Sequence, residues 1–164
     1  MTDDRKADWA QAVCALPRDS VVVVRARDAG RRRALVKKLY GLARLLIAND
    51  PGLAEEIGAA GLHLPELRMR EAGHWRARHP DWIITSSAHS LRALMGTAHL
   101  DAVFLSPIFA TTSHRGAKPL TPVRAATIAA QAEVPVYALG GVTVRNGVLL
   151  APSFSGIAAI TSLL

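Results

Sequence analysis

The chain has 164 residues, half of them hydrophobic, which suffices for one well-buried domain and is too short for two ordinary ones. Uninterrupted apolar stretches stay well below a membrane span, and the first residues lack a signal peptide's apolar core, so we expect a cytoplasmic protein. The formal charge of +7 lies largely on residues 25–38, which read as a solvated helix face, and aromatic residues make up only 5% of the chain. Because bases stack on aromatic side chains, these features argue against a nucleic-acid partner, and an anionic small molecule explains the charge equally well.

Short apolar runs alternate with segments of helical composition along the chain. Helices are predicted over residues 9–16, 28–40, 51–60 and 121–133. Strands are predicted over residues 21–25, 43–48, 61–64, 82–86, 102–106, 135–139 and 156–160. This alternation predicts a parallel sheet, and the lack of a Gly-x-Gly-x-x-Gly fingerprint favours a TIM-type (β/α) barrel over a doubly wound sheet. We expect a single domain over residues 1–164.

One strand of the expected barrel is missing from the pattern. A complete (β/α)8 barrel has eight strands, but no strand is predicted before residue 9, and the chain stops directly after the last predicted strand. We therefore expect a barrel that lacks its first strand and its last helix. The edge between residues 21–25 and 156–160 should be strained, solvated or covered by a partner, and a homodimer is the simplest cover.

Three successive strands end in groups that suit a phosphate. The strand at 102–106 breaks at Ser106-Pro107 into a polar, basic loop that contains Thr111 and His114. The next strand ends in Gly140-Gly141, and the last ends in Thr161-Ser162. Loops after the last two strands of this barrel commonly hold phosphate, which predicts a site from the two glycines, Thr161 and Ser162. The alternative for the glycines is a tight turn between strand and helix.

Histidines are the candidates for proton transfer. His89 follows the strand at 82–86, flanked by Ser87 and Ser90, and could act as an acid or base near neutral pH. A structural histidine with satisfied hydrogen bonds is the alternative. His114 either contacts a ligand phosphate or lies in an exposed loop. His63 is expected to pack near the rim, and the lone Cys14 is expected to be a small buried helix residue.

The order of these motifs resembles the thiamine phosphate synthase/TenI family over residues 21–163. The matching pieces are Leu46–Asp50, Gly58–Leu64, Thr85–Ser90, Asp101–Phe109 with Thr111, Val134–Val142 with Asn146, and Gly156–Ile160. The resemblance implies a TIM barrel that handles the phosphorylated thiazole of vitamin B1. Synthase members join it to hydroxymethylpyrimidine diphosphate with Mg²⁺ and release diphosphate. TenI-type members include an enzyme that aromatises the thiazole by tautomerisation.

Several positions depart from the synthase pattern. The motif Gln-x-Arg-x-Lys becomes Val23-Val-Arg-Ala-Arg27, which keeps two cations and loses the amide that would read the pyrimidine. Asn49 and Asp50 match, and the resemblance makes Asp50 a metal ligand. The second metal-binding aspartate is replaced by Arg68. Since Mg²⁺ prefers oxygen ligands, Asp50 needs help from Glu66 to hold it.

These residues leave three functions open. The first is a synthase-like enzyme with degenerate pyrimidine and metal sites, in which Arg25, Arg27, Asn49, Ser87 and Thr111 contact a small phosphorylated substrate. The second is a tautomerase in which His89 acts with His114 or Glu66 and no metal is needed. The third is a noncatalytic protein that binds a phosphorylated ligand or regulates. Arg25 and Arg27 have an alternative role as partners of Asp50 or Glu66.

Overall fold

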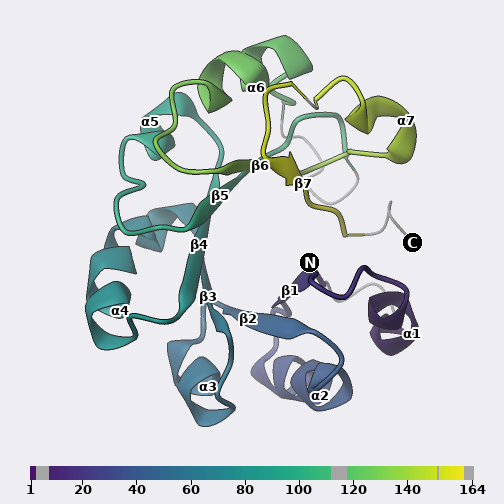
Figure 1. Cartoon of the computed structure of the whole chain (residues 1–164), viewed down its shortest axis with the longest axis vertical. Coiled ribbons are helices and arrows are strands. Elements are labelled where there is room, and N and C mark those ends of the chain that lie inside the picture. The colour runs from purple at the N-terminus through teal and green to yellow at the C-terminus, as the bar shows by residue number, and fades with distance from the viewer. Residues whose placement is uncertain (3–7, 112–117, 151, 161–164) are drawn as a thin grey trace. The chain divides into compact units, whose positions relative to one another are not determined.

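The computed structural model describes residues 1–2, 8–111, 118–150 and 152–160. Packing divides the chain into two compact units, the first comprising residues 1–63 and 81–83 and the second comprising residues 64–80 and 84–163. Figure 1 traces the alternation of strands and helices from purple β1 to yellow β7. None of the helices in the described ranges is long and apolar enough to cross a membrane.

The first unit is built on parallel strands that pair in chain order. β1 pairs with β2 and β2 pairs with β3, so that Val24, Ile47 and Leu62 lie side by side. Between the strands lie short helices that begin just beyond the carboxyl ends of β1 and β2. The elements are α1 (Trp9–Cys14), β1 (Val21–Val24), α2 (Ala29–Leu39), β2 (Arg44–Ala48), α3 (Pro51–Glu56) and β3 (Gly61–Leu64), whose last residue belongs to the second unit.

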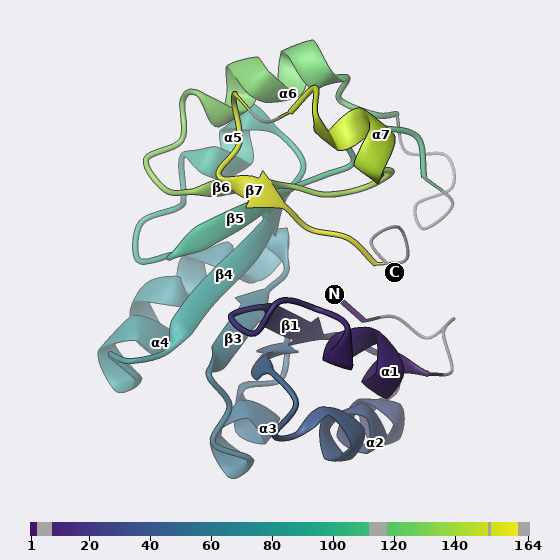
Figure 2. The same cartoon turned by 45° about the vertical axis from the view of Figure 1, so that its right-hand side comes forward.

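The second unit repeats this plan with four parallel strands, again in chain order (Figure 2). Ala88, Leu105, Ala138 and Ile157 are aligned across β4, β5, β6 and β7. The elements are the 3₁₀ helix η1 (Glu66–Glu71), α4 (Ala72–Arg78), β4 (Ile83–Ala88), α5 (Leu91–Leu94), β5 (Ala102–Leu105), α6 (Pro122–Ala129), β6 (Val136–Ala138), α7 (Val144–Gly147) and β7 (Gly156–Ile157).

Side-chain caps fix where five of the described helices begin. The Asp8 side chain accepts from the Gln11 N–H in the first turn of α1. The side chains of Asp28, Asp50, Ser90 and Thr143 each accept a hydrogen bond from a backbone N–H in the first turn of α2, α3, α5 and α7. Each cap satisfies a donor that has no partner inside the helix. The four caps of α2, α3, α5 and α7 follow a strand closely, so they also set the path of the chain at the carboxyl ends of the strands.

The strand–helix alternation expected of a TIM-type (β/α) fold is confirmed. All seven predicted strands are present, and the last is shorter than expected, at Gly156–Ile157. Within the described ranges no strand precedes α1 and no helix follows β7, which agrees with a fold lacking its first strand and last helix. The prediction that Cys14 is buried is wrong, because α1 packs through Trp9, Ala12 and Val13 and leaves the thiol exposed.

The edge of β1 is partly covered by the beginning of the chain itself. The Thr2 backbone N–H donates to the Val23 carbonyl at 2.9 Å. Its hydroxyl accepts from the Arg25 N–H at 2.8 Å and donates to the Arg25 carbonyl at 2.9 Å. Thr2 is fully buried. We expected this edge to be strained, solvated or covered by a partner, whereas here one residue of the same chain, Thr2, satisfies part of it. The homodimer stays a prediction.

The core of each unit consists of strand residues that pack against the helices. Val24, Leu46 and Leu62 are fully buried in the first unit, and Ile84, Val103 and Leu105 in the second. His63 is buried among the apolar strand residues of β3, as expected for a packing role. Burial, together with the nearby positive charge of Arg25, lowers its pKa to about 3. His63 is therefore neutral throughout the physiological pH range.

Removing the Thr2 hydroxyl should destabilise the first unit. Thr2→Val keeps the shape of the side chain but leaves the Arg25 N–H and carbonyl without it, which costs about 1–3 kcal/mol for buried polar groups. Urea unfolding followed by circular dichroism measures this. Thr127→Val, which removes an exposed hydroxyl from α6, is the matched control and should change little. Equal stabilities of the two variants would mean that the Thr2 contacts do not hold the edge.

The buried His63 should make folding stability fall as the pH is lowered. Below about pH 6.5 the unfolded chain binds a proton at His63 and the folded chain does not, so stability is lost between about pH 6.5 and pH 3. The slope from this residue is about 1.4 kcal/mol per pH unit. His63→Gln should flatten that part of the stability–pH curve, and His74→Gln, at an exposed position, should not. Parallel curves for wild type and His63→Gln would contradict the assignment.

Candidate active site

In the second unit, the register of the strands brings three strand ends together. Ala88 of β4 lies beside Leu105 of β5, which lies beside Ala138 of β6. The residues that follow these strands, His89, Ser106 and Leu139, therefore leave the sheet at one edge. This is the carboxyl edge, where parallel α/β folds hold their active sites.

His89 is held by the neighbouring strand. Its imidazole Nδ1 lies 2.7 Å from the carbonyl oxygen of Ser106 and 3.3 Å from the Ser106 hydroxyl. A carbonyl oxygen can only accept, so the 2.7 Å contact assigns the proton of the neutral ring to Nδ1 and the lone pair to Nε2. Ser106 is buried, whereas His89 is exposed at the edge of the unit. The arrangement fixes both the tautomer and the direction of the ring.

The Glu66 carboxylate fixes the backbone of His89. Its Oε2 accepts the backbone N–H of His89 at 2.6 Å, a short hydrogen bond to a charged acceptor. We expected Glu66 to act either as an acid/base partner or as a metal ligand. The contact makes it a support for the residue that carries the imidazole, and both expected roles stay predictions. Sequence reasoning gave no role to Ser106, although the break at Ser106-Pro107 marked this loop as special.

The predicted phosphate-binding glycines pack against the loop that follows β5. The Phe109 N–H donates to the Gly140 carbonyl at 3.0 Å. A Cβ on Gly140 would lie 2.9 Å from the Pro107 Cα, and one on Gly141 would lie 2.5 Å from the Ala110 carbonyl oxygen. Both glycines have positive φ, 89° and 67°. The turn thus requires glycine for its own packing, and its part in phosphate binding stays a prediction.

The remaining predicted residues of the second unit are only partly described. Ser87 lies on β4 two residues before His89 and is half-buried, as is Thr111 beyond the loop that contacts the glycines. His114, Thr161 and Ser162 lie outside the described residues. The structure therefore places neither the partners proposed for the diglycine turn nor His114, one of the two partners proposed for His89.

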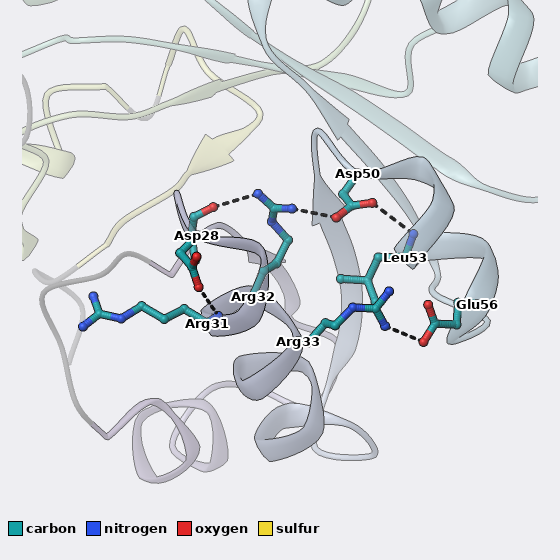
Figure 3. A network of polar contacts seen from close by, with 8 residues as sticks. Asp28, Arg31, Arg32, Arg33, Asp50, Leu53 and Glu56 are labelled. Carbon is teal, nitrogen blue, oxygen red and sulfur yellow. Dashed lines mark hydrogen bonds and ion pairs between the residues drawn. The ribbon is translucent and has the colours of Figure 1, made fainter.

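In the first unit, the residues after β1 and β2 form a charged network (Figure 3). Asp50 Oδ2 accepts from Arg32 Nη1 at 2.6 Å, and Asp50 Oδ1 accepts from the Leu53 backbone N–H at 3.1 Å. Arg32 Nη2 also donates to the Ala26 carbonyl at 2.9 Å. Arg25 and Arg27 were the expected partners of Asp50, whereas the 2.6 Å contact comes from Arg32, which the sequence pattern placed on a solvated helix face.

The residues at these positions do not fit Mg²⁺. Both oxygens of Asp50 are engaged, one by a guanidinium and one by the cap of α3. Arg68, at the second aspartate position, donates twice to Glu71, at 2.7 and 2.6 Å. Across the described part of the chain, no three His, Cys, Asp or Glu side chains gather closely enough to hold a metal ion. Mg²⁺ needs several oxygen ligands in near-octahedral geometry, and this donor set does not supply them.

Comparisons with known proteins agree with this architecture. The chain is 38% identical over 113 residues to a protein of Aquifex aeolicus (strain VF5) named "Putative thiamine-phosphate synthase 2", a match that covers 68% of this chain. It spans about three fifths (59%) of that relative's length. The fold is similar to the solved structure of thiamine phosphate pyrophosphorylase from Pyrococcus furiosus, with a TM-score of 0.76, 18% identity, and coverage of 97% of this chain and 82% of that one.

The family itself follows from the match along the sequence. The sequence profile described as thiamine monophosphate synthase matches residues 3–163, nearly the whole chain. The match includes the strand ends that carry His89 and the diglycine turn. It also includes the strand end that carries Asn49 and Asp50. The TIM-type alternation, the motif order and this match together place the chain in the thiamine monophosphate synthase family.

Proposed function

We propose that this protein binds the phosphorylated thiazole of vitamin B1 synthesis and catalyses a proton transfer on its ring, as a thiazole tautomerase. The observation that carries the proposal is the 2.7 Å contact between His89 Nδ1 and the Ser106 carbonyl. It fixes an imidazole at the carboxyl edge of the sheet with its lone pair on Nε2. A base that is already oriented loses little freedom when substrate binds.

The proposed reaction needs no group beyond the chain and its substrate. His89 Nε2 removes a proton from the non-aromatic thiazole ring and becomes an imidazolium. The electron pair left behind shifts the double bond that the ring shares with its side chain into the ring, which becomes aromatic. The exocyclic carbon takes a proton from the imidazolium, and this regenerates the histidine. Glu66 and Ser106 serve as positioning residues, because they contact the backbone N–H and Nδ1 of His89.

The phosphate of the substrate would sit at the ends of the last two strands. Gly140 and Gly141 are adjacent to the loop after β5, which follows Ser106 directly, so an anion at that turn would lie close to the His89 edge. Thr161 and Ser162 are proposed to supply hydroxyl donors there. This placement rests on the general use of such loops for phosphate in (β/α) folds.

A second candidate function is the joining of thiazole phosphate to hydroxymethylpyrimidine diphosphate. The family and the name of the Aquifex aeolicus relative favour it. The residues at the two metal-ligand positions argue against it, since Asp50 pairs with Arg32 and Arg68 pairs with Glu71. Val23 stands where synthases carry the amide that would read the pyrimidine, and it is buried in β1.

Substituting His89 should abolish turnover and spare binding. In His89→Asn, the rate of aromatisation of the non-aromatic thiazole phosphate, followed by ultraviolet absorbance, should fall by roughly 100-fold or more, because a general base is lost. Calorimetry should show thiazole phosphate still bound. The rate should be the same in EDTA and in Mg²⁺. His74→Asn, on the exposed side of α4, is the control.

The same protein should be tested for joining activity with both substrates and Mg²⁺, by measuring released diphosphate. Robust joining with no aromatisation would replace the tautomerase by the second candidate. Binding of thiazole phosphate without either reaction would mean that the protein is a noncatalytic binding protein.

Changes at Glu66 should separate positioning from chemistry. Glu66→Ala removes the acceptor of the His89 backbone N–H, so kcat should fall by roughly 10- to 100-fold as the imidazole loses its position. Glu66→Gln keeps an oxygen acceptor and should retain most of the activity. If Glu66 exchanged protons with the substrate, both variants would instead lose activity. Equal losses in Glu66→Ala and Glu66→Gln would therefore show that Glu66 takes part in the proton transfer.

A further inference from the structure

Arg32 differs from the two arginines beside it in the sequence. The side chain of Arg33 pairs with Glu56 at the surface, where each is 53% exposed, and Arg31 is exposed near the helix cap. The Arg32 side chain is only 13% exposed and turns toward the loops that follow β1 and β2 (Figure 3). Burying a guanidinium costs free energy unless hydrogen bonds and opposite charges compensate for the lost water.

The guanidinium of Arg32 bridges two strand ends. Nη1 donates to Asp50 after β2, and Nη2 donates to the Ala26 carbonyl after β1. Its Nε is buried without a hydrogen-bond partner among the described residues. Moving the guanidinium away from Asp50 would therefore also break its hydrogen bond to the Ala26 carbonyl. It acts as a fixed positive charge at the carboxyl ends of the two strands.

Each carboxylate oxygen of Asp50 already accepts a hydrogen bond in this arrangement. Oδ2 holds Arg32, and Oδ1 caps α3 through the Leu53 N–H. A divalent cation at Asp50 would lie beside the Arg32 guanidinium, which does not lose its proton in proteins, and would compete with it for the charge of the carboxylate.

We propose that Arg32 replaces the divalent cation at Asp50. The positive charge available to an anion at the ends of β1 and β2 then comes from arginine and not from a metal ion. The charge that a metal would bring is supplied by a side chain of the protein. Any phosphorylated ligand at this end of the unit would then bind without divalent metal. This inference concerns the metal position alone and is independent of the reaction proposed for His89.

A metal titration tests the inference without any substrate. Mn²⁺ prefers the same carboxylate oxygens as Mg²⁺, and the signal of free Mn²⁺ in electron paramagnetic resonance reports how much is bound. Wild-type protein should show no stoichiometric binding up to about millimolar Mn²⁺, the range of weak carboxylate sites. Arg32→Met, which keeps the apolar stem and removes the charge, should lower the Kd by roughly tenfold or more. Arg32→Met with Asp50→Asn should lose the gain.

The matched control is Arg33→Met, which removes a neighbouring charge from the same helix and should leave Mn²⁺ binding at the wild-type level. Arg32→Gln, which removes the charge and keeps a polar side chain, serves if Arg32→Met does not fold. Stoichiometric Mn²⁺ binding by wild type that is lost in Asp50→Asn overturns the inference. So does a folded Arg32→Met or Arg32→Gln protein that binds no more Mn²⁺ than wild type. Because thiazole phosphate is not used, an inactive His89 site would not affect either result.

Discussion

The hydrogen-bond register between parallel strands decides which side chains can act together in each unit. A shift by one residue would turn every strand side chain to the other face and move the loops that follow. In the second unit the register places the residue after Ala88 beside the residue after Leu105, and so His89 beside Ser106. In the first unit it sets the loop after β1 against the loop after β2, within reach of one guanidinium.

The fold could be predicted from local patterns because its elements are short and clearly bounded. Short apolar runs such as 102–105 are typical of strands covered on both faces, and Pro122 marks the start of α6. The covered edge of β1 could not be predicted, because a polar start of the chain gives no strand pattern. Thr2 contacts β1 through one backbone N–H and one hydroxyl, which is too local a signal to read from composition.

Some residues of the candidate site could be predicted from the sequence and others could not, because the sequence does not show which groups contact each other. His89 was identified from its place after a strand, whereas the acceptor that fixes its ring is a backbone carbonyl, a group that every residue possesses. Arg32 was missed because its neighbours Arg31 and Arg33 are solvated, and helical phase alone did not reveal which of the three turns inward. Asp50 matched the family at its position, yet sequence comparison by position does not tell which cation a carboxylate holds.

The diglycine turn has a consequence for reading sequence variation. At Gly140 and Gly141 the space that any Cβ would take is filled by the backbone around Pro107 and Ala110, and the backbone is left-handed at both. Every other residue is therefore excluded there by steric overlap, whether or not a phosphate binds. In a deep mutational scan or an alignment, strict preference for glycine at these two positions would report on how two loops fit together. It would carry no information about the ligand.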